Sequence, residues 1–354
     1  MLMPKARRQV TSAKAVIGWT ALGFLLVQLA LDIFVVSRHP ELRDPEYATR
    51  LARLRERMAE NPQRPLMVML GSSRTVGSFI PEKLPAIYSS AGESPLVFNF
   101  SHLGAGPGMN MVEARRLLRD GIRPKWMIVE VMPPQLNDGN QGILLSTSTP
   151  HDLSVTRRYR HPLMVYSTFV RSHLVPSYNF RQFLAHSAIP GWIPEAEWQM
   201  GIPKIDHLGG DETLQTRDLN YEAALSQYMT TEARKGYEPA LQNLQIADLS
   251  DRATRDLLRF CKRRGITVVL LLTPEGSAFQ SWYSAESRRR VESYCSSISN
   301  EYRVPLIDAR NWLADDDFVD SHHVNARGAE KFTLRLGREV IQPLANGDLA
   351  NRQP

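Results

Sequence analysis

The sequence predicts an α/β protein built on a doubly wound parallel sheet of about five strands, of the flavodoxin-like kind. Apolar runs recur along the chain without the alternation of a half-exposed strand, as expected of strands covered on both faces. Amphipathic helical patterns lie between these runs, and alternation of strands and helices is typical of parallel sheets. The predicted strands cover residues 65–73, 95–101, 125–134, 265–276 and 304–309.

The N-terminal region predicts a membrane anchor. Residues 1–14 carry four basic side chains and no acidic one, and the 22 residues 15–36 contain Asp32 as their only ionisable residue. About 20 apolar residues span the hydrocarbon core of a bilayer. Basic residues before such a span favour a cytoplasmic N-terminus, which would place the main domain outside the cytoplasm. A cleaved signal peptide and a buried soluble helix are the alternatives, but the length and the absence of a small-residue cleavage pattern after Val36 favour the anchor.

Charge and cysteine content exclude several classes of protein. The formal net charge is +6, and four of these charges lie in residues 1–14, so the rest of the chain is close to neutral and no nucleic-acid partner is expected. Cys261 and Cys295 are the only cysteines. They are too few for a zinc site or a disulfide-rich scaffold, and we expect them to be unpaired, although an exported domain could join them. No phosphate-binding or zinc-protease motif occurs, so we expect no cofactor and no metal.

The remaining organisation follows from composition. Residues 37–64 are charged and predict a linker or stalk helix, and residues 65–344 form the main domain. Residues 139–249 interrupt this domain between the third and fourth strands and are too many for a plain loop, so we expect a helical cap or lid. Residues 345–354 predict a disordered tail.

Two short stretches contain the residues typical of acyl-transfer chemistry. "LGSSRT" places Ser72 and Ser73 directly after the first strand, and "DSHHVNARGAEKF" places Asp320 and His323 three residues apart in a loop before a helix. That spacing allows the carboxylate to hold one ring nitrogen while the other stays free to act as a base. The carboxyl ends of parallel strands share one sheet edge, where the two stretches would meet. Either serine, or Asp320, could instead cap the helix that follows it.

Together the two stretches resemble the SGNH (GDSL-like) hydrolase superfamily. "LGSSRT" is similar to its first block and "FVDSHHVNARGAEKF" to its last, D-x-x-H-x-N-x-x-G, and the order and flanking strands match over residues 65–344 apart from the insertion. The resemblance implies that Ser73 is the nucleophile and that Asp320 and His323 are its catalytic dyad. His322 would then be an exposed neighbour.

The resemblance also implies oxyanion donors, and here the chain departs from the pattern. The backbone N–H groups of Ser73 and Gly104 are implied donors, with Gly106 as an alternative alignment. The third block, G-x-N-D, is not present in recognisable form, and Asn137 in "VEVMPPQLNDG" could supply that donor from a later position. Ser72 stands where the commonest members have Asp.

The resemblance implies a membrane-anchored bacterial enzyme that hydrolyses or transfers acyl esters. The expected substrates are acyl esters outside the cytoplasm, with O-acetyl groups of cell-surface polysaccharide as the expected class. One alternative is a catalytically inactive, carbohydrate-binding or scaffold subunit of an envelope assembly. Another is a lipid esterase facing the cytoplasm, if the anchor inserts in the opposite direction. Protein partners cannot be predicted from these residues.

Overall fold

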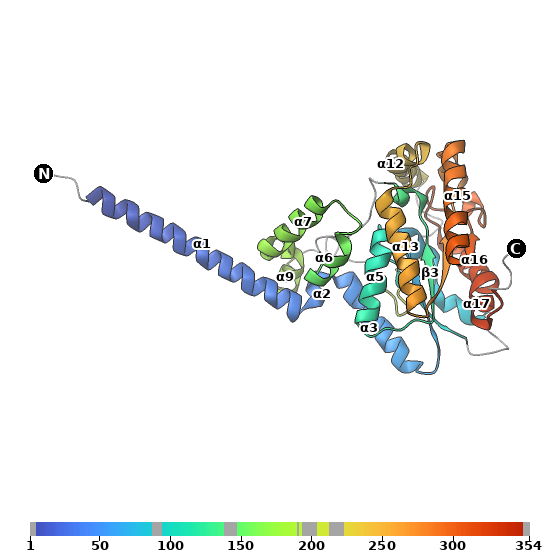
Figure 1. The fold of residues 1–354 in the computed structure, drawn as a ribbon, viewed down its shortest axis with the longest axis horizontal. Helices are drawn as coiled ribbons and strands as arrows, with labels where there is room; N and C mark the ends of the chain where they lie inside the picture. Colours follow the sequence, from blue (N-terminus) through green and yellow to red (C-terminus); the bar gives the residue numbers. More distant parts are fainter. Residues whose placement is uncertain are drawn as a thin grey trace. The chain divides into compact units, whose positions relative to one another are not determined.

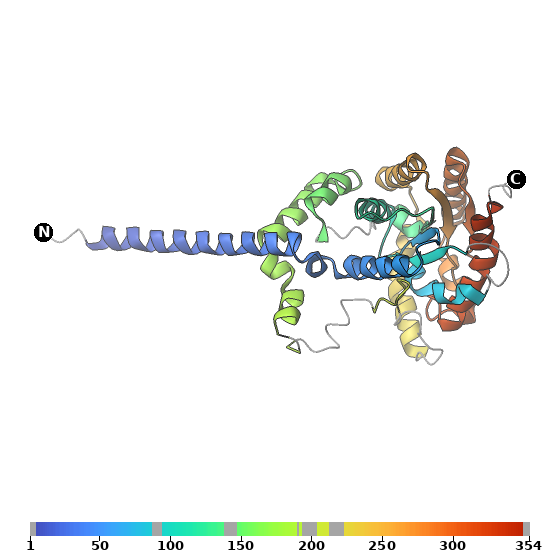
Figure 2. The ribbon, with the colours of Figure 1, turned by 90° about the horizontal axis from the view of Figure 1, so that it is seen from below.

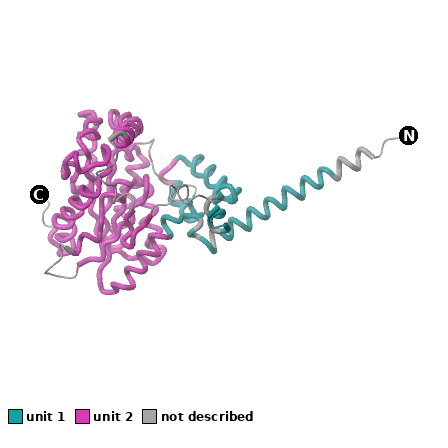
Figure 3. The backbone as a smooth tube through the Cα atoms, turned by 180° about the vertical axis from the view of Figure 1, so that it is seen from behind, with its two compact units in different colours: residues 1–48, 145–157, 161–201 teal, residues 49–144, 158–160, 202–354 magenta. Residues whose placement is uncertain are grey.

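The computed structural model describes residues 5–86, 94–137, 147–189, 191–192, 204–211 and 223–349. The chain divides into two compact units, coloured separately in Figure 3. Unit 1 comprises residues 1–48, 145–157 and 161–201, and unit 2 comprises residues 49–144, 158–160 and 202–354. Each unit is described by itself.

Unit 2 contains a five-stranded sheet in which every pair of neighbouring strands is parallel. The strand order β2-β1-β3-β4-β5 is the doubly wound order of flavodoxin-like folds, so the predicted fold class is confirmed. Each predicted apolar run contains one strand, and the small and turn residues that end the run form the loop after it. The strands are β1 (Leu66–Leu70), β2 (Leu96–Asn99), β3 (Trp126–Glu130), β4 (Thr267–Leu272) and β5 (Leu306–Asp308).

Helices cover both faces of this sheet. On one face α5 (Pro107–Arg119) packs against α13 (Asp248–Arg263), and Figure 1 shows the two side by side in front of the strands. On the other face α16 (Ala326–Leu336) contacts α4 (Ser73–Ser78) and the 3₁₀-helix η1 (Pro81–Ala86), and it continues through the π-helical turn η5 (Gly337–Ile341) into α17 (Gln342–Asn346). Besides most of α3 (Pro45–Glu60), the remaining described helices of unit 2 are η2 (Pro133–Leu136), α12 (Ala223–Gln242), α14 (Ser277–Ser281), α15 (Ala285–Tyr302) and η4 (Asp315–Asp317).

Successive side chains along each strand point to opposite faces of the sheet, so the apolar core has one part on each face. Met67, Ile128 and Val269 pack in a cluster with Phe332 and Leu336 of α16. The intervening residues face the opposite helices, and there Met127 meets Cys261 of α13 with 3.7 Å between the sulfur atoms. Because both faces of β1, β2, β3 and β4 are buried, their sequences are apolar at nearly every position.

The structure describes packed segments on both sides of the predicted main domain, residues 65–344. The predicted stalk contains α3 (Pro45–Glu60), whose Arg50 and Leu54 are buried, and unit 2 already begins at Thr49. Arg50 is held because its Nε donates to the carbonyl of Gly209 at 3.1 Å. The predicted disordered tail starts too early, since α17 runs to Asn346 and Leu349 packs in the apolar core. Residues 350–354 lie outside the described residues.

The insertion forms helices, but it does not form one body. Its described residues up to 192 belong to unit 1 except residues 158–160, which belong to unit 2 together with the part from Ile202 onward. A single cap over residues 139–249 is therefore not what the chain builds, and residues 139–146, 190, 193–203 and 212–222 lie outside the described residues. The helices in unit 1 are α6 (Pro150–Thr156), α7 (Pro162–Leu174), α8 (Pro176–Asn179) and α9 (Arg181–Ala188).

Unit 1 is organised around one long helix, α1 (Lys5–Ser37), followed by the short α2 (Pro40–Arg43). Residues 13–35 of α1 form a stretch that is long and apolar enough to cross a membrane, and most of this stretch is exposed. Helices α7 and α8 contact α1, and Figure 2 shows them beside its C-terminal end. The predicted span of residues 15–36 thus coincides with one uninterrupted helix.

Candidate active site

Ser73 lies where the chain turns from β1 into α4. Gly71 and Ser72 form the turn, and Ser73 is the first residue of α4. Ser72 is the N-cap, and its Oγ accepts a hydrogen bond from the backbone N–H of Arg74 at 3.2 Å. The alternative interpretation of a helix-capping serine therefore applies to Ser72, whereas the hydroxyl of Ser73 is available for another partner.

Asp320 and His323 lie at the tip of a narrow loop that follows η4. Phe318 and Val324 form an antiparallel bridge, and the backbone N–H of Val319 donates to the carbonyl of His323 at 2.9 Å. This pairing holds the two ends of the loop, at Phe318 and Val324, close together. Asp320 and His323 therefore stand on a short, closed loop and not on a long free segment.

Two residues of the D-x-x-H-x-N-x-x-G pattern hold this loop against α16. Asn325 caps α16, since its side-chain oxygen accepts from the backbone N–H of Gly328 at 2.9 Å. A Cβ atom at Gly328 would lie 2.2 Å from the carbonyl oxygen of Asp317, so only glycine fits at this close approach. The cap belongs to Asn325 and not to Asp320, whose carboxylate is left for the histidines.

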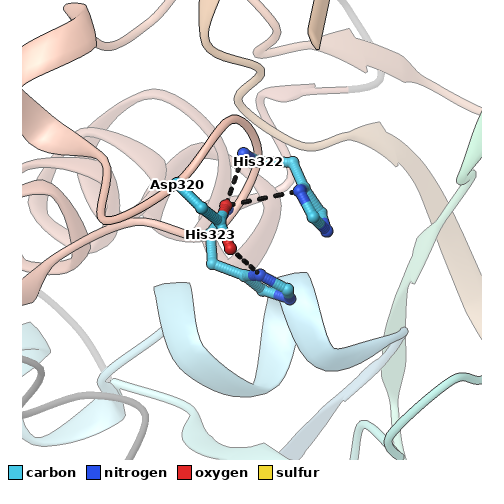
Figure 4. A group of neighbouring side chains, drawn as sticks. All are labelled: Asp320, His322 and His323. Carbon is cyan, nitrogen blue, oxygen red and sulfur yellow. Dashed lines mark hydrogen bonds and ion pairs between the residues drawn. The ribbon is translucent and has the colours of Figure 1, made fainter. Parts of the chain in front are cut away.

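The structure brings the three predicted catalytic side chains into one chain of hydrogen bonds. Ser73 Oγ lies 3.0 Å from His323 Nε2, and His323 Nδ1 lies 2.8 Å from Asp320 Oδ2. Figure 4 shows the Asp320 carboxylate between the two imidazoles. Asp320 is buried, whereas the His323 side chain keeps 20% of its surface exposed. The arrangement therefore runs from a buried carboxylate to the hydroxyl of the half-buried Ser73.

Asp320 is held in its ionised form. Burial alone would raise the pKa of this carboxyl, but His323 and the hydrogen bonds to Asp320 outweigh burial and hold the pKa well below its usual range. Its Oδ1 accepts the backbone N–H groups of both His322 and His323, each at 2.7 Å. An ionised carboxylate only accepts hydrogen bonds, so the proton on His323 resides on Nδ1 and Nε2 accepts from the Ser73 hydroxyl.

His322 is not the exposed neighbour that the sequence suggested. Its side chain is buried, and its ring stacks on Phe279 with 5.4 Å between centroids and meets the edge of Tyr237 at 5.2 Å. Its Nδ1 also lies 3.3 Å from Asp320 Oδ1. The sequence contains no amphipathic signal for this position because the packing partners come from α12 and α14, far away along the chain.

Glu130 fixes the turn that carries Ser73, and it was not among the residues predicted to form the site. It ends β3, is buried, and accepts hydrogen bonds from the backbone N–H of Ser72 at 2.5 Å and from the Thr75 hydroxyl at 2.7 Å. Its other oxygen accepts the Thr273 hydroxyl at 3.0 Å. An acidic residue at the end of an otherwise apolar buried strand, "WMIVE", was the signal for this role.

Asn99 and Arg74 hold α4 from its two sides. The Asn99 side-chain amide donates to the carbonyls of Thr75 and Phe79, at 3.1 and 3.2 Å. The Arg74 guanidinium is buried and donates to the carbonyl of Pro274 at 2.6 Å, in the loop after β4. These bonds attach the short nucleophile helix to the ends of β2 and β4, which fixes where Ser73 points.

A buried ion pair continues this network. Arg74 lies 3.4 Å from Glu275, and both side chains are almost fully buried. Burial raises the pKa of Glu275, while the neighbouring Arg74 charge and the Tyr283 hydroxyl, which donates to Glu275 at 2.9 Å, act in the opposite direction. Removing one partner of such a pair would leave an uncompensated buried charge.

The predicted oxyanion donors lie on loops at the same sheet edge. Ser73 opens α4, so its N–H has no carbonyl one turn earlier to bind. The loop after β2 runs beside the nucleophile turn, where the His102 N–H donates to the Gly71 carbonyl at 2.9 Å, and Gly104 follows with a φ of +69°. Asn137 is half-buried at the end of η2. The participation of Gly104 and Asn137 stays a prediction.

The alternative glycine, Gly106, has a structural role. It is the N-cap of α5, and a Cβ atom there would lie 3.2 Å from the side chain of Gln135. Gly106 therefore permits the loop after β2 to approach η2 closely. This approach keeps the two loops that carry the predicted donors next to one another.

Two groups of acidic and histidine side chains have ligand atoms within 4.8 Å of one another among the described residues. One is Asp320, His322 and His323, whose atoms already bind each other and Ser73. The other is Glu82, Asp206 and His207, in which His207 Nδ1 lies 3.0 Å from Glu82 Oε1. The first group is occupied by the hydrogen bonds described above, which suit proton transfer.

Comparison with known proteins adds one match. A protein-family model matches residues 222–345, about a third of the chain, and its description states no function. This region includes Asp320 and His323 but not Ser73. No curated protein matches the chain.

Proposed function

We propose that this protein is a serine-dependent acyl-ester hydrolase or O-acyltransferase of the SGNH type. The observation that carries the proposal is the continuous chain of hydrogen bonds from Ser73 through His323 to Asp320. A hydroxyl, an imidazole and a buried carboxylate in this order form the arrangement that activates a serine for attack on a carbonyl. The resemblance of the two sequence blocks to that superfamily supports the same assignment.

The proposed reaction proceeds through an acyl-enzyme. Ser73 Oγ attacks the ester carbonyl as its proton passes to His323 Nε2, and Asp320 stabilises the imidazolium that forms. The tetrahedral intermediate collapses when the ester C–O bond breaks, and the departing alcohol takes the proton from His323. The N–H groups of Ser73 and Gly104, with the Asn137 side chain, are the proposed oxyanion donors.

The second half of the reaction decides between hydrolase and transferase. Water or a sugar hydroxyl gives its proton to His323 and attacks the acyl carbonyl, and Ser73 then leaves with that proton. The same three residues serve both acceptors. The acceptor is therefore determined by residues outside this chain of hydrogen bonds.

We place this activity outside the cytoplasm, on acyl esters of cell-surface polysaccharide such as O-acetyl groups. The support is the apolar span of α1 behind a basic N-terminus, which is the charge pattern of a cytoplasmic N-terminus with an exported domain. The protein would then be a single-pass membrane protein with a periplasmic unit 2. Accessibility of unit 2 to an added protease in cells with a permeabilised outer membrane, but an intact inner one, would test this orientation.

A fluorophosphonate probe tests the nucleophile directly. Full-length protein in detergent micelles is expected to label at Ser73, and Ser73→Ala is expected to lose both labelling and p-nitrophenyl acetate hydrolysis. Ser72→Ala is the matched control, since it removes only the helix cap, with a stability loss of about 1 kcal/mol, and should still label. Labelling of Ser73→Ala at the wild-type level would contradict the assignment.

The competing proposal is a non-enzymatic, carbohydrate-binding or scaffold role in an envelope assembly. It is favoured by the absence of a G-x-N-D block, because β3 ends in Glu130, whose carboxylate accepts hydrogen bonds from the nucleophile turn and offers no oxyanion donor. This proposal predicts that neither the wild-type protein nor Ser72→Ala reacts with the probe. Loss of one oxyanion donor lowers turnover about a hundred- to a thousandfold, so a slow enzyme still labels while a binding protein does not.

A further inference from the structure

We propose that α7 and α8 lie in the headgroup region of a phospholipid bilayer, beside the outer end of α1, with one exposed face of α7 against the lipid. The partner is the membrane surface. This inference concerns unit 1 alone and goes beyond the proposed activity of unit 2.

The first step is the depth at which α7 and α8 touch α1. His173 of α7 lies 2.8 Å from Asp32, and the backbone N–H of Ser177 in α8 donates to the Gln28 side chain at 3.1 Å. Both Gln28 and Asp32 lie inside the apolar span of residues 13–35. At 1.5 Å per residue they stand about 10 Å and about 5 Å before its end, which is the depth to which an interfacial helix buries its apolar face. The helices that contact these positions lie beside the C-terminal end of α1 (Figure 2), so they would share its depth in a bilayer.

The second step is the satisfaction of the polar groups in the span. Gln28 is 4% exposed, and the His173 and Asp32 side chains keep less than a fifth of their surface, although the surrounding α1 residues are exposed. An unpaired polar side chain in hydrocarbon is costly. Helices α7 and α8 therefore cover the side of α1 that carries Gln28 and Asp32. The apolar residues of α1 stay exposed on its other sides, where they can contact lipid.

The third step is the exposed face of α7. Leu163, Tyr166, Val170 and Leu174 are spaced by three, four and four residues, so they share one side of the helix, and each is at least 42% exposed. Val165 and Ser172 lie on the opposite side and are buried. A stripe of this length on a short helix is unusual in water and fits the acyl boundary of a bilayer.

The fourth step is the charge and aromatic content around this stripe. The surrounding residues of unit 1, 157 and 161–192, contain three arginines and no acidic residue. Arg171 is exposed on α7, and the Arg181 guanidinium lies over the ring of exposed Tyr178, 4.4 Å from its centroid. Arginine beside tyrosine and tryptophan is the composition that anchors helices among anionic headgroups. Trp192, 70% exposed, follows α9 with the same character.

Site-directed spin labelling of the full-length chain in phosphatidylcholine–phosphatidylglycerol vesicles tests the proposal. Nitroxides are attached at Leu163→Cys and Val170→Cys, with Phe24→Cys in α1 as the hydrocarbon reference and exposed Lys235→Cys in unit 2 as the water reference. All four positions are exposed, so the substitutions remove no packing. The two native cysteines are buried, so we expect them not to react with the label. Wild-type protein treated with the same label serves as the blank for any reaction at these two residues.

The measured quantity is the ratio of collisions with oxygen to collisions with a water-soluble nickel complex. We expect ratios at Leu163→Cys and Val170→Cys several-fold above that of Lys235→Cys and below that of Phe24→Cys. Ratios equal to that of Lys235→Cys would overturn the proposal. Protection from both reagents, with line broadening that disappears on dilution by unlabelled protein, would mean that a second copy covers the face, and this also overturns it. An aqueous ratio at Phe24→Cys would overturn the premise that α1 is inserted.

Discussion

Two adjacent serines follow β1, and their hydroxyls bind different partners. Ser72 accepts the Arg74 N–H and caps α4, whereas Ser73 lies 3.0 Å from His323. The helical turn explains this difference, because the N-cap side chain points back toward the first free N–H groups while the next residue points outward. The proposed acyl transfer depends at this scale on Asp320, because its carboxylate accepts a hydrogen bond from His323 Nδ1 and so keeps the ring proton on that nitrogen.

Asp320→Asn is expected to lower kcat about ten-thousandfold with little change in fold. An amide at this position presents an N–H group to His323 Nδ1 and favours the tautomer whose proton faces Ser73, so the imidazole no longer accepts the serine proton. Release of p-nitrophenol measures kcat, and the thermal unfolding midpoint measures the fold.

Asp316→Asn is the matched control for this change. Asp316 lies four residues earlier, its side chain is 71% exposed, and it pairs with Arg327 on the surface. We expect wild-type kcat for this variant, because a surface ion pair contributes at most about 1 kcal/mol. A kcat of Asp320→Asn within tenfold of Asp316→Asn would remove the assigned role.

The strand-to-helix turn at the end of β1 sets the position of Ser73, and close contacts around the turn allow it only one backbone conformation. Glu130 accepts hydrogen bonds from both sides of the turn, at Ser72 and at Thr75. Gly71 lies against this pair, and a Cβ atom there would lie 2.4 Å from Thr75 Oγ1 and 2.5 Å from Glu130 Oε2. Glu130 is thus a positioning residue, which acts through the backbone that carries the nucleophile.

Gly71→Ala is expected to destabilise the protein by about 1–3 kcal/mol and to abolish fluorophosphonate labelling, because the added methyl group must displace the Thr75–Glu130 contact. Gly236→Ala is the matched control. Gly236 is exposed inside α12 with nothing within 4 Å of a new Cβ atom, so alanine there should stabilise by about 0.5–1 kcal/mol and leave labelling unchanged. Thermal unfolding and probe labelling of both variants check the prediction, and equal effects of the two changes would contradict it.

The elements that could be predicted from sequence are those with a local signal. The five strands follow from continuous apolar runs, and α4 and α16 follow from turn and cap residues such as Ser72 and Asn325. The Ser73–His323 contact follows from chain order because parallel strands share one edge. The burial of His322 could not be predicted, since Tyr237 and Phe279 lie tens of residues earlier in the chain and show no periodicity with it. Glu130 had a local signal, an acidic residue at the end of an apolar strand, but that signal does not indicate its partners Ser72 and Thr273.

At the scale of the whole molecule, long segments of the chain divide between two compact units. The insertion after β3 leaves unit 2, packs its helices on α1, and returns to unit 2 by Ile202. Sequence composition predicted a helical insertion but not this division. The signal was the run of arginine and aromatic residues in 157–192, which fits a membrane surface better than a cap over a polar site.

The core of unit 2 predicts the reactivity of both cysteines. Cys261 and Cys295 are free, buried thiols on α13 and α15, and burial raises the pKa of each to about 12. At pH 8 only about one thiol in ten thousand with such a pKa is ionised, compared with about one in four for an ordinary cysteine. We therefore expect no alkylation by iodoacetamide between pH 7 and 9 in the native protein, and two alkylated residues after denaturation without reductant. Intact-protein mass spectrometry reads the number of added groups, and native alkylation that rises steeply with pH would show that the helices do not cover the sheet as described.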